Sequence, residues 1–108
     1  MPELRRGQVW RADLPDDKQR PVLIVSSDAM NRAQDRTIIV PITTTIRGHE
    51  VEVRLDPDRA PVTSVSVVKC DAILTLPKAY LIEYLGPLLN DELNAVDEAL
   101  RSALGLDW

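Results

Sequence analysis

The sequence predicts a mainly β protein with some helix, folded as a small half-open β-barrel capped by helices. Residues 8–85 form a series of short aliphatic and β-branched runs separated by turn segments, and one strong helix follows them. The 108 residues contain no repeat and no Gly/Ser-rich linker, and a chain of this length forms one domain without disulfides. Hydrophobic residues make up 44% and aromatic residues only 4%, so we expect a single domain over residues 1–108 with an aliphatic core.

The first two strands are predicted on either side of a short acidic loop. After Gly7, residues 8–14 alternate loosely between the two faces of a strand. Residues 15–19 contain the proline and aspartates that are typical of a turn. Residues 21–25 are continuously aliphatic, which indicates a strand that is buried on both faces.

A helical turn and a further strand are expected next. The Ser-Ser-Asp segment at residues 26–28 can cap a helical turn over residues 29–34. Residues 37–42 are β-branched and apolar, as in a strand, and Pro41 within them indicates an edge strand or a bulge.

The middle of the chain predicts two more strands. Residues 51–55 alternate between aliphatic and charged side chains, as in a half-exposed strand. In residues 65–72 the apolar positions change phase halfway, which predicts a β-bulge, because one extra residue swaps the two faces of a strand. The single cysteine, Cys70, is interpreted as a small apolar residue of this strand.

The end of the chain predicts a short helix, a last strand and the clearest helix of the protein. Pro77 suits the first turn of the short helix, and residues 81–85 form the strand. Asn90 can cap the final helix, and Gly105 can end it. One face of this helix is predicted to carry four apolar side chains, Leu93, Val96, Leu100 and Leu104.

The distribution of charge leaves room for a local phosphate site. Thirteen basic and seventeen acidic residues give a net charge of −4, which argues against a simple polyanion-binding protein. Residues 1–60 are neutral overall, but nine of their ten basic residues are arginine, whose planar guanidinium suits phosphate. The first half can therefore hold a phosphate site, although solvent-exposed arginines would explain the same pattern.

Several kinds of catalytic site are not expected from the composition. The single histidine, His49, lies in a polar stretch and is predicted to be a loop residue, and one cysteine is too few for a structural zinc site. The four glycines are scattered, so no phosphate-binding loop is predicted. No apolar run approaches the ~20 residues of a membrane span, and the amino terminus lacks the pattern of a secretory signal. We therefore expect a cytoplasmic protein that needs no metal, no cofactor and no membrane.

Arg20 and Thr43 are the candidate site residues. Arg20 stands directly before the buried strand at 21–25, and Thr43 opens a run of three threonines after the strand at 37–42. If these strands are neighbours, a guanidinium and a hydroxyl converge on one phosphate. The alternative is a solvated arginine and threonines that are ordinary strand-end residues.

At these residues the sequence resembles the MazF/PemK family of toxin ribonucleases from bacterial toxin–antitoxin pairs. The similar segments are RRGQVWRADL, RPVLIVSSDAMNR, VPITT, SVVKCDAILTLPK and VDEALRSALGL, which run in order along nearly the whole chain. The resemblance implies an SH3-like barrel of the CcdB/MazF type, usually a homodimer, and metal-independent cleavage of single-stranded RNA such as messenger RNA. It also implies neutralisation by a cognate, MazE-like antitoxin.

By this resemblance, Arg20 falls on the family's catalytic arginine and Thr43 on its catalytic threonine. RNA supplies its own nucleophile, the 2′-hydroxyl, which would explain a site without histidine. Arg20 would stabilise the charged phosphate, and Thr43 would hold a phosphate oxygen or polarise the 2′-hydroxyl. The secondary RNA-binding candidates are Lys18, Ser26, Ser27, Asn31 and Thr44. For Ser26, Ser27 and Asn31, capping of the helical turn is the alternative.

Two departures from the family pattern concern RNA contacts. The loop at 14–20 is shorter than the family's usual loop and lacks its Gly-Ser-Glu, and Ala72 and Leu74 stand where the family often has Gln and Arg. Loop gating and base specificity therefore do not carry over to this chain.

The same scaffold allows a non-enzymatic function as the alternative, like that of the CcdB toxins that poison DNA gyrase. Such a protein does not need Arg20 and Thr43, and Trp108 would then be a candidate anchor. Packing or fraying of the last helix is the simpler interpretation of Trp108, and an inactive binding module is a third function. Cleavage of single-stranded RNA in the presence of a chelator distinguishes the enzyme from the other two.

Overall fold

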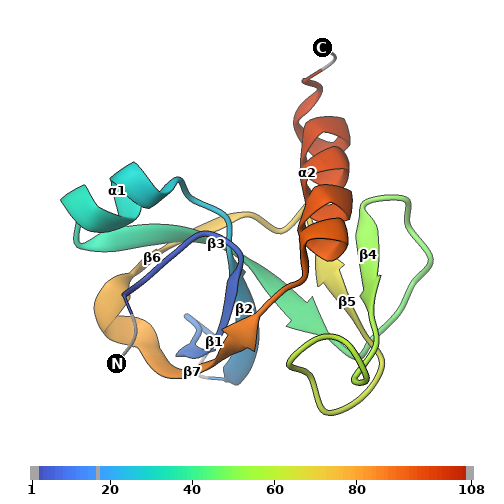
Figure 1. The fold of residues 1–108 in the computed structure, drawn as a ribbon, viewed down its shortest axis with the longest axis horizontal. Coiled ribbons are helices and arrows are strands. Elements are labelled where there is room, and N and C mark those ends of the chain that lie inside the picture. Colours follow the sequence, from blue (N-terminus) through green and yellow to red (C-terminus); the bar gives the residue numbers. More distant parts are fainter. Residues whose placement is uncertain (1–2, 17, 107–108) are drawn as a thin grey trace.

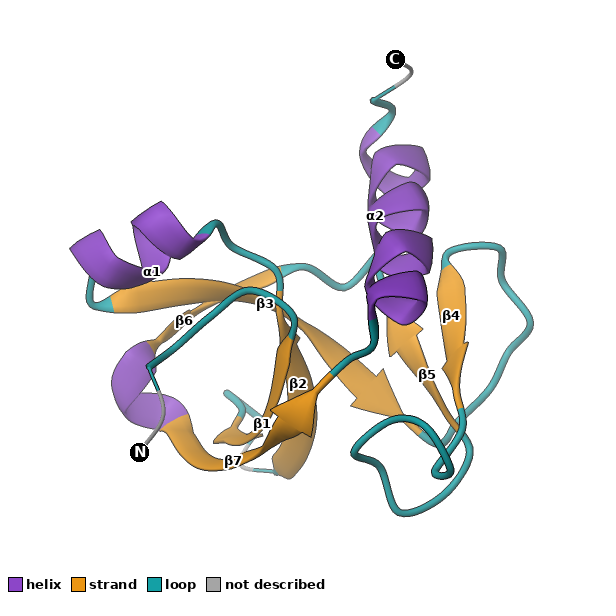
Figure 2. Ribbon diagram, in the orientation of Figure 1, coloured by secondary structure: helices purple, strands orange, loops and turns teal. Residues whose placement is uncertain are grey.

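An antiparallel, seven-stranded sheet and two α-helices make up the described part of the chain, residues 3–16 and 18–106 of the computed structural model (Figure 1). The strand order is β4-β5-β3-β2-β1-β7, and β6 also pairs with β3. The sheet curls into a half-open barrel with helices beside it, so the predicted fold class is confirmed (Figure 2). In chain order the elements are β1 (Gln8–Asp13), β2 (Gln19–Ile24), α1 (Asp28–Ala33), β3 (Arg36–Thr43), β4 (Glu52–Leu55), β5 (Ser66–Lys69), β6 (Leu74–Pro77), the 3₁₀ turn η1 (Lys78–Tyr80), β7 (Leu81–Pro87) and α2 (Asn90–Leu104).

The central strands separate two hydrophobic cores. On β2, Val22 and Ile24 belong to the first core, and Leu23 between them belongs to the second. The predicted burial of this strand on both faces is therefore confirmed, because consecutive side chains of a strand point to opposite faces. The first core, which we call the barrel core, consists of Trp10, Ala12, Val22, Ile24, Ile39 and Leu76. The second, the helix core, is closed by α2 and includes Val9, Leu23, Val40, Ile42, Leu55, Ala60, Val68, Cys70, Leu88, Val96 and Ala99.

β3 changes its partner along its length. Residues 36–39 pair with β6 and residues 42–43 with β5, while residues 39–41 pair with β2. Pro41 lies where the β6 pairing has ended and the β5 pairing has not begun, so its missing N–H interrupts neither of these two ladders. The prediction of an edge strand is wrong for β3 as a whole, which is a central strand, although Pro41 itself pairs only with β2 among the described strands.

The predicted β-bulge in residues 65–72 is wrong. The phase changes between Val67 and Val68, within β5, which pairs with β3 and β4 without a register shift. Both side chains are buried although they point to opposite faces, so the period of two is lost without an extra residue. β5 ends at Lys69 and β6 begins at Leu74. Cys70 lies in the turn between them and is fully buried in the helix core, as an apolar residue would be. Burial raises the pKa of its thiol to about 11. Pro77, predicted in the first turn of a helix, is the last residue of β6.

The C-terminal helix α2 follows the prediction except at its two ends. Its N-cap is Leu89 instead of Asn90, and the Glu92 carboxylate accepts a hydrogen bond from the Leu89 N–H (2.8 Å). Val96 is fully buried, but Leu104 is 56% exposed because the end of α2 projects beyond the strands (Figure 1). Gly105 ends the helix with a φ of 71°, as predicted.

The remaining predicted elements lie close to observed ones. The strands predicted at 8–14, 51–55 and 81–85 correspond to β1, β4 and β7, and the helical turn corresponds to α1. Neither helix in the described ranges is long and apolar enough to cross a membrane.

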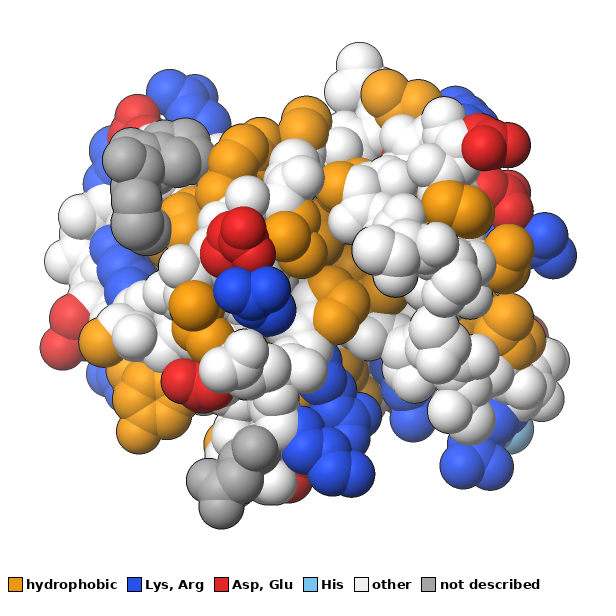
Figure 3. Space-filling model, turned by 90° about the horizontal axis from the view of Figure 1, so that it is seen from below, with side chains coloured by type: hydrophobic (Ala, Val, Ile, Leu, Met, Phe, Trp, Pro, Cys, Tyr) orange, Lys and Arg blue, Asp and Glu red, His pale blue; other side chains and the backbone are white. Residues whose placement is uncertain are grey.

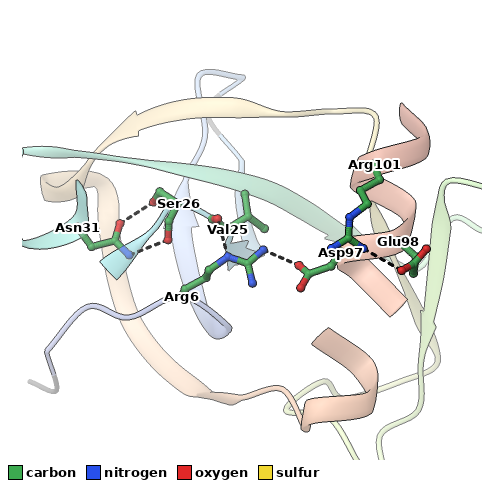
Figure 4. A network of polar contacts seen from close by, with 7 residues as sticks. All are labelled: Arg6, Val25, Ser26, Asn31, Asp97, Glu98 and Arg101. Atoms are coloured by element: carbon green, nitrogen blue, oxygen red, sulfur yellow. Dashed lines mark hydrogen bonds and ion pairs between the residues drawn. The ribbon is translucent and has the colours of Figure 1, made fainter. Parts of the chain in front are cut away.

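A group of ion pairs and hydrogen bonds ties the amino terminus to both helices (Figure 4). Arg6 donates from Nη2 to Asp97 of α2 (2.5 Å) and from Nε to the Val25 carbonyl (3.0 Å). Its backbone N–H donates to Asp28, the first residue of α1 (2.7 Å). We call Arg6, Asp28 and Asp97 the N-terminal clasp. The clasp holds the segment that leads into β1 against the end of β2.

Candidate active site

A cleft of about 560 Å³ opens between the barrel and the loops that follow β3 and β4. Seen from below, this face of the molecule has a hollow with hydrophobic side chains at its base and Lys and Arg side chains gathered beside it (Figure 3). The described residues that line the cleft include no carboxylate. Its polar lining consists of two guanidinium groups and five hydroxyl groups, from Arg11, Arg20, Thr43, Thr44, Thr45, Thr63 and Ser66.

The structure brings Arg20 and Thr43 to this same cleft. β2 and β3 are antiparallel neighbours, with Val22 opposite Pro41. Continuing that register by two residues sets Arg20 opposite Thr43, on the same face of the sheet. The condition that the sequence left open, that the two strands are neighbours, is met.

Among residues 3–16 and 18–106, the side chains of Arg20 and Thr43 each have one hydrogen-bond partner. The Arg20 guanidinium, whose side chain is 35% exposed, donates from Nη2 to Asp16 Oδ2 (3.1 Å). Thr43 Oγ1 accepts a hydrogen bond from the Thr45 N–H (3.1 Å). The remaining N–H groups of Arg20 and the O–H of Thr43 stay available to a ligand.

A second hollow of about 420 Å³ lies on the other side of Arg20. Arg20 lines both hollows, whereas Thr43 lines only the larger cleft. Ala72 and Leu74, the two departures from the family pattern, line the second hollow, and its other walls are mostly apolar. Arg20 therefore marks the border between the cleft, whose lining includes several hydroxyl groups, and a hollow lined mostly by apolar residues.

Three of the secondary RNA-binding candidates are used by the fold itself. Ser26 and Asn31 are 4% and 2% exposed, and their side chains bond to each other and to Thr37 on β3 (Figure 4 shows the first pair). We call Ser26, Asn31 and Thr37 the α1 anchor. Ser27 caps α1 by accepting a hydrogen bond from the Met30 N–H (3.2 Å). The structure gives these residues the capping and anchoring role, and none of them lines either hollow.

The other candidates lie on the surface. Thr44 is exposed and lines the cleft, while Lys18 is exposed in the β1–β2 loop and lines neither hollow. His49 is an exposed loop residue, as predicted. Among residues 3–16 and 18–106, no three side chains of His, Cys, Asp or Glu gather in a way that could hold a metal ion.

Arg11 is the charged residue of the cleft lining that the sequence did not identify. It lies on β1 between Pro21 of β2 and Glu83 of β7, and its Nη1 pairs with Glu83 Oε1 (3.0 Å). The only signal in the sequence is a charged residue in the middle of an apolar strand. That signal gains meaning only once β1 is known to be central in the sheet.

The fold places the chain in a class of small toxins whose solved structures superpose on nearly the whole chain. A mycobacterial endoribonuclease, solved in complex with its cognate antitoxin, is 40% identical to this protein with a TM-score of 0.87, over 97% of this chain and 98% of that one. A MazE–MazF complex from Deinococcus radiodurans is 26% identical with a TM-score of 0.82, over 99% and 100% of the two chains.

The family assignment rests on the sequence comparison. The family of PemK-like, MazF-like toxins of type II toxin–antitoxin systems matches residues 5–104, and the chain belongs to this family. The probable endoribonuclease MazF5 of Mycobacterium tuberculosis is 35% identical over 99 residues, 92% of this chain and 91% of the relative. Endoribonuclease MazF1 of Mycobacterium bovis is 41% identical over 103 residues, 95% of this chain and 94% of the relative. The resemblance stated from the sequence is therefore confirmed.

Proposed function

We propose that this protein is an endoribonuclease toxin of the cytoplasm that cuts single-stranded messenger RNA. The observation that carries the proposal is that Arg20 and Thr43 line one cleft with no described carboxylate in its lining. Such a cleft favours an anionic ligand even in a protein of net charge −4. The relatives named as endoribonucleases support the same activity here.

The reaction that fits this cleft uses the nucleophile of the RNA itself. The 2′-oxygen attacks the adjacent phosphorus, and the bond from phosphorus to the 5′-oxygen of the next nucleotide breaks. The 2′-hydroxyl loses a proton and the leaving 5′-oxygen gains one, so the products are a 2′,3′-cyclic phosphate and a 5′-hydroxyl. The protein then has to orient the chain and stabilise charge, and no metal is needed to generate a nucleophile.

Arg20 is proposed to stabilise the phosphate as negative charge builds on its oxygens. A guanidinium stays protonated and is a poor general base, but it donates two parallel hydrogen bonds to phosphate. Its ion pair with Asp16 is exposed, so a phosphate can take the place of the carboxylate. Arg20 therefore acts by electrostatic stabilisation in this mechanism.

Thr43 is proposed to donate a hydrogen bond to a phosphate oxygen. Because its oxygen already accepts from the Thr45 N–H, its own O–H proton is directed toward another acceptor. Of the two roles considered from the sequence, this hydrogen bond favours holding the phosphate over polarising the 2′-hydroxyl. Thr44 is a candidate for a further contact from the same wall.

The proposed partners are a cognate antitoxin and a second copy of this chain. An antitoxin segment that folds into the cleft would cover Arg20 and Thr43 and block RNA. Dimerisation is proposed through exposed hydrophobic side chains, which include Ile46, Ile73, Tyr80, Ile82, Leu89 and Leu104. Sedimentation that gives only a 12.1 kDa species at micromolar concentration would contradict the dimer.

The gyrase-poison alternative is not favoured, because the relatives at 35–41% identity are named endoribonucleases. Trp108, the candidate gyrase anchor, lies outside the described residues. No observation in the cleft requires this alternative.

The test is an RNA cleavage assay in the presence of a chelator. Purified protein is incubated with a long transcript, and the cut ends are mapped. We expect Arg20→Ala to reduce cleavage by a factor of about 100 or more, the scale for loss of a transition-state donor. Arg36→Ala is the matched control, because Arg36 is an exposed arginine at the other end of β3. Unchanged cleavage by Arg20→Ala would overturn the mechanism, and no cleavage of any RNA would favour the gyrase alternative.

A further inference from the structure

The cleft contains a second guanidinium that the proposed reaction does not use. Arg11 lines the same cleft as Arg20 and Thr43. It belongs to β1, the strand that pairs with β2 on the side away from β3. A cleft that needed a single phosphate-binding group would have no use for a second arginine on the neighbouring strand.

The register fixes how the two arginines stand relative to each other. Arg20 is opposite Ala12 and Arg11 is opposite Pro21, so the two arginines are diagonal neighbours whose side chains leave opposite faces of the β1–β2 pair, and both line the cleft. A strand spacing of about 4.8 Å and a rise of about 3.3 Å put the two Cα atoms about 6 Å apart. Arg20 borders both hollows and Arg11 borders only the larger cleft. An RNA strand that runs from the second hollow over Arg20 into the larger cleft would therefore bring the phosphate next to the one at Arg20 toward Arg11.

The hydrogen bonding of Arg11 is incomplete. Its Nη1 pairs with Glu83, but its Nε is shielded from solvent and has no acceptor among the described residues. An N–H group without an acceptor in such a place costs free energy in the unbound protein. The exposed part of the Arg11 side chain, which is 43% exposed as a whole, is the part that a ligand oxygen can reach. Arg54 is another strand arginine with an acidic partner, but its Nε is not left without an acceptor, because Nε and Nη2 both donate to Asp56. Arg54 does not line the cleft.

We propose that Arg11 is a positioning residue that binds the phosphate next to the scissile one, with Glu83 holding the guanidinium until RNA arrives. This inference rests on the proposed function, since it assumes that RNA occupies the cleft. Both members of the ion pair are substantially exposed, 43% for Arg11 and 52% for Glu83, so exchange of the carboxylate for a phosphate does not require unfolding. Arg11 then contributes to RNA affinity, and Arg20 contributes to the chemical step.

The two members of the ion pair should have opposite effects on RNA binding. The probe is a short RNA that contains the mapped cut site, with a 2′-deoxy nucleotide at the attacking position so that it cannot be cleaved. Arg11→Ala should weaken binding about tenfold, the scale of a hydrogen bond to a charged group. Glu83→Gln should strengthen binding severalfold, because it removes the carboxylate that competes with phosphate. Arg54→Ala is the matched control and should bind like the unaltered protein.

The salt dependence and one modified RNA identify the ligand of Arg11 as a phosphate. Arg11→Ala should reduce the slope of log affinity against log salt by about 0.7, the value for one phosphate contact on a single strand. Replacing one phosphate beside the cut site with a neutral methylphosphonate should weaken binding to the unaltered protein about tenfold and have no further effect on Arg11→Ala. If the methylphosphonate weakens binding to Arg11→Ala as much as to the unaltered protein, at every phosphate beside the cut site, then Arg11 does not bind any of these phosphates and the proposal is wrong.

Failure of this inference is distinguishable from failure of the proposed function. If Arg20→Ala abolishes cleavage but neither Arg11→Ala nor Glu83→Gln changes affinity, Arg11 has only a structural role and the inference is wrong. If Arg20→Ala cleaves normally, the proposed mechanism itself is wrong, whatever Arg11 does. Thermal melts of the variants separate loss of binding from loss of folding, and Arg11→Lys, which keeps the charge, should restore part of the affinity.

Discussion

The cleft and the α1 anchor each contain a threonine of β3, and the two hydroxyl groups are in opposite situations. In the anchor, Thr37 is fully buried and its hydroxyl bonds to Ser26 and Asn31 (2.8 and 3.0 Å). In the cleft, Thr43 at the other end of the strand is only half-buried and accepts one hydrogen bond from its own loop. The comparison teaches that exposure and unused hydrogen-bonding capacity, rather than residue type, separate a hydroxyl that is available to a ligand from a structural one.

The largest expected effect of a matched substitution is on cleavage by Thr43→Val. Valine keeps the shape of threonine and removes the O–H donor, so we expect RNA cleavage to fall about ten- to a hundredfold, the range for a hydrogen bond to a charged group. The melting temperature should stay within about 2 °C of the unaltered protein, since an exposed strand end contributes little. Single-turnover rates and a thermal melt measure the two effects. A drop in melting temperature with normal cleavage would show that Thr43 has a structural role and does not bind RNA.

The same substitution at Thr37 should change stability and leave the chemistry alone. Thr37→Val deprives two buried partners, Ser26 and Asn31, of a hydrogen bond, and we expect unfolding free energy to fall by about 1–3 kcal/mol. Cleavage per folded molecule should be unchanged at a temperature where the variant is folded. Denaturant titration provides the free energy. A variant of full stability would contradict the role of the anchor.

The smallest predicted effect concerns Cys70, a buried group whose charged form has no partner. Burial raises the pKa of the folded thiol from 9.0 to about 11. Between these values the unfolded chain loses the proton and the folded chain keeps it, so stability falls as pH rises. We expect a loss of about 1 kcal/mol between pH 9 and pH 10 that is absent in Cys70→Ala. Parallel pH dependence in the two proteins would show that other groups are responsible.

Much of the fold follows from the sequence because runs of aliphatic residues and one amphipathic helix have distinct periods. The phase change at residues 65–72 was misread as a bulge, because a short strand that is buried on both faces also breaks the period of two. Only the pairing of β5 with its two neighbours decides between these explanations. Leu104 was misjudged for a related reason, since helical spacing does not reveal where the body of the protein ends.

The site could be predicted only in part. Arg20 and Thr43 were identified from their places at the ends of two buried strands and from the resemblance to a family. Ser26 and Asn31 carry the same kinds of polar group, and nothing local distinguishes them from cleft residues. Arg11 enters the cleft through the neighbours of β1, which are set by contacts far apart in the chain.

The late position of β6 and β7 in the chain has a consequence during synthesis. β3 obtains part of its pairing from residues 74–77, and β1 obtains one neighbour from residues 81–87. A nascent chain that has emerged only as far as Thr43 therefore carries both catalytic candidates but lacks the strands that hold them in place. The sheet around the cleft is therefore complete only when residues up to 87 have left the ribosome.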